Sequence, residues 1–207
     1  MIDNLIKRYP SLKGIENEIK TATDILYNCY KNGGKILLCG NGGSASDCEH
    51  IAGELLKGFL SKRKMPDSDA EKLEILGDSK EYFVNNLQRG IPAISLPSQL
   101  GVISAFCNDV EPDLVYAQLV YAYKSDNDVL VGLSTSGNSK NVVNAFKVAK
   151  AFNLKTVAFT GSMLCKLDEF SSVSIKAPET ETYKVQEYHL AIYHAICAEL
   201  ELRAFNK

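Results

Sequence analysis

The chain has 207 residues, of which 45% are hydrophobic and 23% are charged, and its net charge is −2. These values describe an ordinary globular protein that is long enough for one sizeable core, or at most two small ones. The charge balance argues against nucleic-acid binding through a basic surface, and no apolar run has the length of a transmembrane helix.

The six cysteines, at positions 29, 39, 48, 107, 165 and 197, show no spacing typical of a metal site. Most of them lie inside apolar runs, where a cysteine usually acts as a small buried hydrophobic residue. The N-terminus does not resemble a signal peptide, because Asp3, Asn4 and Lys7 interrupt it. We therefore expect a reduced, cytoplasmic chain that does not engage a membrane.

The N-terminal segment, residues 1–33, is expected to be helical. Between residues 11 and 32 apolar side chains recur every three or four positions, which predicts an amphipathic helix that ends at Gly33 and Gly34. Because this helix precedes the first strand, its apolar stripe needs cover from the sheet or from a second subunit.

A short strand and a glycine-rich turn come next. Residues 35–39 (KILLC) have the length and apolar character of a strand, and residues 40–44 (GNGGS) predict a tight turn. A helical pattern follows, with Ser44 or Ser46 available as N-cap. A helix N-terminus behind a glycine turn binds anions, because its N–H groups point outward and the helix dipole adds positive charge. This stretch is a candidate phosphate site.

Residues 61–90 are the most polar part of the chain and are expected to form an inserted excursion. Two short helices are predicted within it, around residues 73–76 and 82–87. The segment is much longer than most connections in a compact domain, so we interpret it as a lid or an interface element. Its run of charges is typical of a solvated face.

The remaining pattern alternates strands with helices. Strands are predicted at residues 91–96, 128–133, 155–160 and 172–176, and helices at residues 100–107, 112–123, 142–149, 164–170 and 182–204. With the first strand, this order predicts an α/β fold with a single-domain, doubly wound, flavodoxin-like parallel sheet of five strands and helices on both faces. Ligands of such sheets bind at the carboxyl ends of the strands.

A second polar turn, residues 134–139 (STSGNS), follows the third strand and therefore lies at the same edge of the sheet. It supplies four hydroxyl groups, and its N–H groups stand at the start of a helix. An ordinary capped turn is the alternative interpretation, since serine and threonine are common in such turns. Two such turns at one edge favour a second phosphate clamp.

Two familiar nucleotide-binding motifs do not explain these turns. Residues 40–45 fit a loose dinucleotide pattern, but that pattern requires an acidic residue at the end of the second strand, which here ends Ser95-Leu96-Pro97. The first turn also lacks the Gly-Lys-Ser/Thr ending of a P-loop.

The histidines lie on the central helix and on the last helix. His50 and Glu54 are one turn apart and share a face, and Gln186 and His194 share a face two turns apart. If the two helices face each other, these side chains form a mixed nitrogen and oxygen cluster. Such a cluster could hold a divalent metal such as zinc or act directly as an acid/base pair, and the spacing leaves both interpretations open.

Three stretches resemble a known family. They are residues 39–54 (CGNGGSASDCEHIAGE), 130–142 (LVGLSTSGNSKNV) and 181–194 (ETYKVQEYHLAIYH), which resemble the sugar isomerase (SIS) domain and, within it, the phosphoheptose isomerases. The resemblance covers nearly the whole chain. It implies a single SIS domain over residues 1–207 and a homotetramer whose active sites are shared between subunits.

The resemblance also implies a reaction and the residues that carry it. The family converts sedoheptulose 7-phosphate to D-glycero-D-manno-heptose 7-phosphate, which requires an enediol and a base that moves a proton between C1 and C2. By similarity, Glu54 is that base and His194 the acid/base partner. The residues implied to bind the substrate and its phosphate are Asn41, Gly42, Gly43, Ser44, Ser134, Thr135, Ser136, Ser139 and Gln186. The residues implied to hold one zinc ion are His50, Glu54, Gln186 and His194.

Three departures from the family pattern affect the substrate assignment more than the fold. Gln99 stands where the family usually has an aspartate, Lys57 is a candidate replacement for an absent arginine, and residues 61–90 are longer than usual. These departures keep a second hypothesis open, a non-catalytic phosphosugar-binding protein similar to bacterial replication-initiator-associating proteins. The presence of both Glu54 and His194 favours the isomerase.

Overall fold

A parallel sheet of five strands forms the centre of the computed structural model, which describes residues 1–205. The strands are β1 (Ile36–Gly40), β2 (Ala93–Ser95), β3 (Val129–Leu133), β4 (Lys155–Thr160) and β5 (Val173–Lys176). Their order is β2-β1-β3-β4-β5, and every neighbouring pair is parallel. This is the flavodoxin-like order, so the predicted fold class is confirmed.

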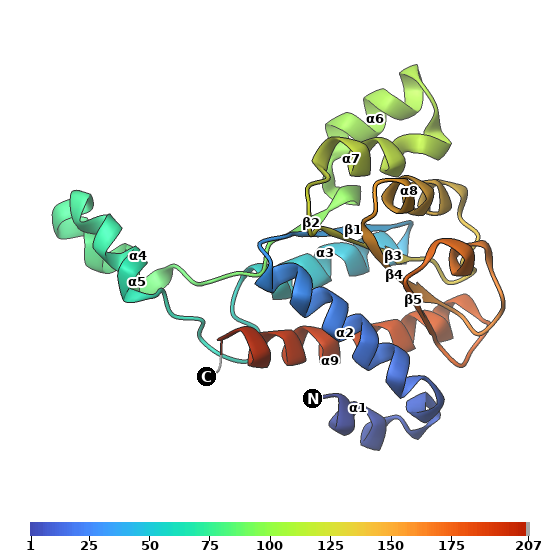
Figure 1. Ribbon diagram of the computed structural model, residues 1–207, viewed down its shortest axis with the longest axis horizontal. Coiled ribbons are helices and arrows are strands. Elements are labelled where there is room, and N and C mark those ends of the chain that lie inside the picture. Colours follow the sequence, from blue (N-terminus) through green and yellow to red (C-terminus); the bar gives the residue numbers. More distant parts are fainter. Residues whose placement is uncertain (206–207) are drawn as a thin grey trace.

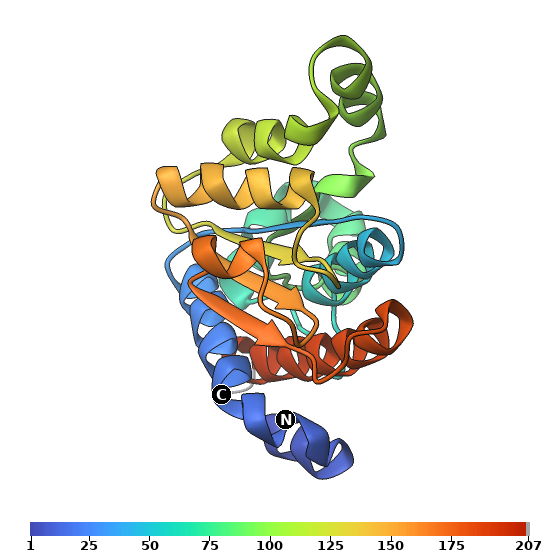
Figure 2. The ribbon, with the colours of Figure 1, turned by 90° about the vertical axis from the view of Figure 1, so that its right-hand side faces the viewer.

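Helices cover both faces of the sheet (Figures 1 and 2). Successive side chains of a strand point to opposite faces, so Ile36 and Leu38 pack on one side while Leu37 and Cys39 pack on the other. The first side is covered by α2 (Glu16–Lys31), α3 (Gly43–Leu56) and α9 (Thr182–Phe205). The second side is covered by α7 (Val115–Tyr123) and α8 (Lys140–Ala151).

The N-terminal segment contains three helical elements instead of the single helix predicted over residues 11–32. These are α1 (Ile2–Arg8), the 3-10 helix η1 (Pro10–Ile15) and α2. Tyr9, which precedes a proline and has the non-helical angles φ −129° and ψ 76°, separates α1 from η1. Inside the predicted range, Ile15, with φ −120° and ψ 17°, separates η1 from α2. The N-terminal amine of Met1 lies 2.9 Å from Glu199, so α1 is fastened to α9.

Residues 65–87, which we call the arm, extend away from the rest of the molecule (Figure 1). The arm contains α4 (Asp67–Lys72), the 3-10 helix η2 (Leu73–Ser79) and α5 (Lys80–Asn86), none of which buries a side chain in the described chain. At its base, Lys64 pairs with Gln88 in an antiparallel bridge. The expected excursion is therefore helical, with helices that begin earlier than predicted.

The remaining elements differ from the predictions mainly at their ends. They are the 3-10 helices η3 (Leu96–Ser98), η4 (Pro112–Leu114) and η5 (Lys166–Phe170) and the helix α6 (Leu100–Asp109). Strand β2 is shorter than the predicted 91–96, since Pro92 and Pro97 flank it and have no N–H to donate. Within residues 1–205, none of the helices has the length and apolar character needed to span a membrane.

Candidate active site

Two loops meet at the carboxyl edge of the sheet between β1 and β3. The connection from β1 leads to α3 on one face, and the connection from β3 leads to α8 on the other, so a crevice opens between the two loops. Asn41 and Asn141 bridge it with a reciprocal pair of amide hydrogen bonds of 2.9 and 3.0 Å. Sequence reasoning missed Asn141, although its amide lies only two residues beyond the second polar turn.

The first loop presents backbone N–H groups instead of a side-chain cap. Gly42 is the N-cap of α3 and has a φ of 57°, a left-handed conformation that favours glycine. The prediction of Ser44 or Ser46 as N-cap was wrong, because α3 begins at Gly43 and Ser44 is buried in its first turn. Within the described chain the N–H groups of Gly42 and Gly43 make no hydrogen bond, so they remain available to an anion.

The second loop brings hydroxyl groups to the same edge. The hydroxyl oxygens of Ser134 and Ser139 lie 3.1 Å apart, and Ser136 is exposed and accepts a hydrogen bond from the N–H of Asn138. The N–H groups of Thr135 and Ser136 are not bonded to any other described residue. Hydroxyl groups and free N–H groups together form a concave donor surface of the kind that binds phosphate.

Further along α3, the helices α3 and α9 bring three predicted site residues together. His50 Nε2 lies 3.3 Å from Glu54 Oε1 and 3.3 Å from His194 Nε2. The side chain of Glu54 is 16% exposed and that of His50 is 43% exposed, so the cluster is open to a ligand. Lys57 Nζ lies 3.4 Å from the other oxygen of Glu54.

A tyrosine and an aspartate orient His50. Tyr193 donates its hydroxyl proton to Asp47 at 3.2 Å, and its oxygen lies 3.0 Å from His50 Nδ1. Because that proton is directed to Asp47, the tyrosine oxygen accepts from Nδ1–H of His50, which directs Nε2 toward Glu54 and His194. Sequence reasoning missed both residues, since Tyr193 continues the apolar stripe of α9 and Asp47 resembles an ordinary helix-surface residue.

Gln186 does not join this cluster. A Cβ atom added at Gly43 would lie 2.7 Å from Gln186 Nε2, which places the Gln186 side chain against the first turn of α3. Gln186 and His194 are eight residues apart on α9, or about 12 Å along the helix axis. The structure thus separates Gln186 from the other three predicted metal ligands and places it beside the first loop.

The donor set of the cluster fits a zinc ion in part. Ligands bound tetrahedrally at about 2.0–2.1 Å lie about 3.3 Å from one another, and His50 makes two contacts of this length. The remaining pair of ligands, Glu54 and His194, is farther apart. In the described chain these two side chains form no ion pair within 4.0 Å. Consistently, no group of three or more His, Cys, Asp or Glu residues among residues 1–205 is closed enough to hold a metal.

The orientation of His50 nevertheless favours a cation or a proton at the centre of the cluster. With its proton on Nδ1, a neutral His50 directs the Nε2 lone pair at a carboxylate oxygen of Glu54, and two such acceptors repel each other unless a positive charge lies between them. Burial, followed by the neighbouring His50, lowers the pKa of His194, so its imidazole is neutral at neutral pH.

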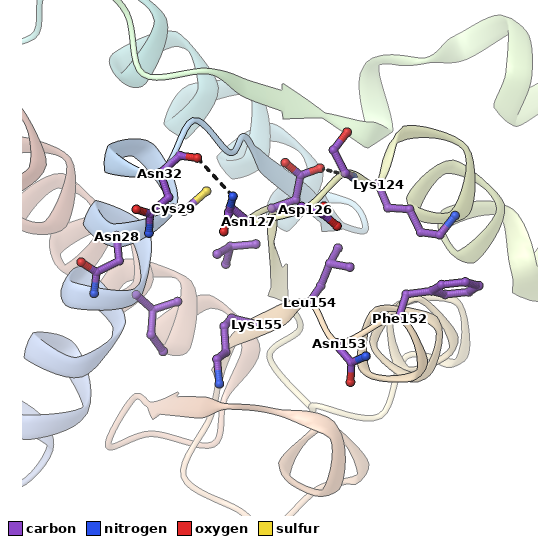
Figure 3. Close-up of a pocket in the computed structure, with 14 residues that line it drawn as sticks. Asn28, Cys29, Asn32, Lys124, Asp126, Asn127, Phe152, Asn153, Leu154 and Lys155 are labelled. Atoms are coloured by element: carbon purple, nitrogen blue, oxygen red, sulfur yellow. Dashed lines mark hydrogen bonds between the residues drawn. The ribbon is translucent and has the colours of Figure 1, made fainter.

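Of two cavities in the described structure, one is lined by the predicted site residue His194 and the other lies away from the site. A cavity of about 670 Å³ between α1 and α9 is lined by His194 and Phe59. Another of about 590 Å³ lies at the opposite edge of the sheet, where β3 and β4 begin, and includes Asn28, Asn153 and Lys155 (Figure 3). Among the described residues, none of the predicted site residues lines this second cavity.

Comparisons with known proteins show the family to which this fold and these sequence motifs belong. Two SIS domain family models match residues 4–72 and 95–204. Phosphoheptose isomerase from Helicobacter pylori is 35% identical over 216 aligned positions, which cover 100% of both chains. Structures of phosphoheptose isomerases from Neisseria gonorrhoeae and Francisella tularensis superimpose with TM-scores of 0.75 and 0.76 at 28% and 25% identity. Each match covers 96% of this chain, and 94% and 93% of the respective relatives.

Proposed function

The chain belongs to the SIS-domain family and, within it, to the phosphoheptose isomerases, and we propose that it interconverts sedoheptulose 7-phosphate and D-glycero-D-manno-heptose 7-phosphate. One observation carries this proposal: a single helix, α3, begins at an anion-binding loop and holds the cluster of Glu54, His50 and His194 further along. His50 lies about 10 Å along the axis from Gly43. An extended seven-carbon sugar phosphate has a comparable length.

The phosphate is bound by the two loops. Its oxygens accept from the N–H groups of Gly42 and Gly43 and from hydroxyl groups of Ser44, Ser134, Thr135, Ser136 and Ser139, while Asn41 and Gln186 contact the sugar near the crevice. The N-terminal end of α3 adds its partial positive charge. Binding energy from the phosphate, which does not react, then serves to orient C1 and C2 at the cluster.

Glu54 and His194 carry the proton transfers. Glu54 removes a proton from C1 of the ketose and returns a proton to C2, so that the intermediate is an enediol. His194, neutral at neutral pH, moves the remaining proton between the oxygens on C2 and C1. The two transfers balance, so the reaction needs no external oxidant or reductant.

We also propose one zinc ion per active site. His50, Glu54 and His194, which meet in this structure, would hold it together with Gln186, the fourth ligand that the resemblance implies, which here lies beside Gly43. When bound, the ion supplies Lewis-acid polarisation of the substrate carbonyl. Metal analysis of the purified protein should find about one zinc per chain, and His50→Ala should remove it. A metal-free protein with full activity would contradict the zinc proposal and leave the isomerase proposal standing.

The assembly we propose is a homotetramer of single SIS domains in the cytoplasm, with residues 61–90 as an insertion. Exposed apolar side chains support association: Ile75 in the arm is 90% exposed, and Leu100 in α6 is 75% exposed. Ile75 shares the arm with the exposed side chains of Tyr82 and Leu87, and groups of exposed apolar side chains, unlike single ones, mark surfaces that bind another protein.

The experiment that tests the function is direct. The purified protein is incubated with sedoheptulose 7-phosphate in deuterated water, and both the aldose product and the deuterium at C1 and C2 are measured by NMR. We expect product and exchange together. Binding of the sugar phosphate without either would overturn the isomerase and favour the non-catalytic binding protein, for which the replacement at Gln99 would then be relevant.

A further inference from the structure

A buried ion pair joins the end of α3 to α9. The side chains of Arg63 and Glu201 are 0% and 2% exposed, and Arg63 Nε lies 2.8 Å from Glu201 Oε1. The run of charges that contains Arg63 was predicted to form a solvated face. This is correct for Lys62 and Lys64, which are exposed, but wrong for Arg63.

The guanidinium of Arg63 caps the C-terminus of α3. It donates to the carbonyl oxygens of Leu55 and Glu54, the latter at 2.8 Å. Carbonyls in the last turn of a helix have no partner within the helix, and a cation there is favoured by the helix dipole. The capped turn is the one that carries the proposed base, Glu54.

Glu201, on α9, binds both Arg63 and the backbone of the segment that follows α3. Its carboxylate accepts from the N–H groups of Phe59 and Leu60 at 2.8 Å and of Ser61 at 3.0 Å, besides Arg63. Burial would raise the pKa of Glu201, but the N–H group of Phe59, the guanidinium and the N–H group of Leu60 outweigh it, so the net shift is downward and the carboxylate stays ionised. Glu201 lies seven residues, or two turns, beyond His194 on α9.

The pair has a geometric consequence besides any effect on stability. Burying two charges costs desolvation energy, and apolar residues of similar volume often stabilise a protein as well or better. The donors of a planar guanidinium have fixed directions. Unlike an apolar contact, they can therefore set both the rotation and the axial position of one helix relative to another. The contacts of His50 with Glu54 and with His194 depend on that register of α3 and α9.

We propose that Arg63, held by Glu201, is a positioning residue of the reaction: it fixes the helix that carries Glu54 and His50 relative to the helix that carries His194. This inference rests on the isomerase function proposed above. A misplacement of about 1 Å among reacting groups can lower a rate by about a hundredfold, so a register set by a buried clamp has direct kinetic consequences.

The test uses the double variant Arg63→Met/Glu201→Leu, which removes both charges together and keeps an apolar contact. We expect its urea midpoint to fall, because the N–H groups of Phe59, Leu60 and Ser61 lose their acceptor. Without urea, where the variant is folded, its kcat should fall at least about tenfold and its KM should change less than about threefold. Arg63→Lys, which keeps the charge but loses the fork, should not restore kcat. If the double variant does not fold, Glu201→Gln carries the same expectation for kcat and KM.

Lys35→Met is the matched control. It breaks another ion pair, in which Lys35 Nζ lies 2.6 Å from the buried Asp128, at the opposite edge of the sheet. This variant should unfold at lower urea with unchanged kcat. A double variant with wild-type kcat would overturn the proposal, and so would a loss of kcat in Lys35→Met as large as that in the double variant.

A second readout does not depend on isomerase activity. The chain has only three histidines, so ¹⁵N-histidine spectra can be assigned readily. The imidazole signals of His50 and His194 should shift in the double variant and not in Lys35→Met. If the wild type proves inactive but these signals shift, the clamp stands and the proposed reaction fails; if the wild type is active but neither kcat nor the signals change, the clamp fails.

Discussion

At the scale of single residues, the proposed chemistry depends on Glu54 and His194. Glu54→Gln keeps the size of the side chain but removes the base, and His194→Asn removes the proton carrier on the facing helix. Each should lower kcat at least about a hundredfold, the usual scale for a positioned acid or base, with a nearly unchanged Kd for the sugar phosphate. Steady-state kinetics and calorimetric titration measure the two quantities, and a normal kcat in Glu54→Gln would refute the assigned base.

His189, the histidine outside the cluster, predicts how stability depends on pH. It is fully buried, its Nε2 donates to the carbonyl of Thr160 at 3.2 Å, and burial lowers its pKa to about 4. The unfolded chain, with an ordinary histidine pKa near 6.5, binds a proton in the interval between these values where the folded chain does not. Stability from this residue is therefore complete above about pH 6.5 and falls, by at most about 3 kcal/mol, as the pH drops to about 4.

His189→Gln tests this expectation, because the amide can still donate to Thr160 and does not titrate. Urea unfolding at one protein concentration and at several pH values from 7 to 4 should give a flatter profile for the variant. Equal slopes in the two proteins would show that His189 does not account for the loss. Carboxylates whose pKa is lowered, such as Glu199, contribute mainly at the acid end of the range.

At the scale of elements, the arm is separable from the rest of the fold. In the part of the chain that the structure describes, its helices bury no side chain, and Lys64 and Gln88 lie opposite each other at its base. Replacing residues 65–87 with a two-residue Asn-Gly turn should therefore leave the urea midpoint within error of the wild type, while far-UV circular dichroism loses the helical signal of the arm. A deletion variant that fails to fold would mean that the arm stabilises the sheet.

At the scale of the whole molecule, we expect association. Light scattering at micromolar concentration should give about four times the chain mass of 22.7 kDa. Leu100→Glu places a charge on the exposed face of α6 and should lower that mass and, because the proposed active sites are shared, the activity as well. Glu169→Gln, a change of charge at an exposed position outside both the arm and α6, is the control that should leave the mass unchanged. A monomeric wild type would refute the tetramer.

The sequence by itself determined the strands, most helices and the two loops at one edge of the sheet. Apolar runs, glycine turns and helical spacing are local patterns, and the carboxyl ends of parallel strands necessarily share an edge. Residues on one helix face, such as His50 and Glu54, could be paired in the same way, because one helical turn separates them.

Only the tertiary structure decided which distant residues meet, because local spacing does not encode the rotation and axial shift between two packed helices. It separated Gln186 from His194, oriented His50 through Asp47 and Tyr193, and buried Arg63, which its charged neighbours had made look solvated. The partner of Arg63 lies 138 residues away, on a helix whose position is fixed only when the sheet has formed.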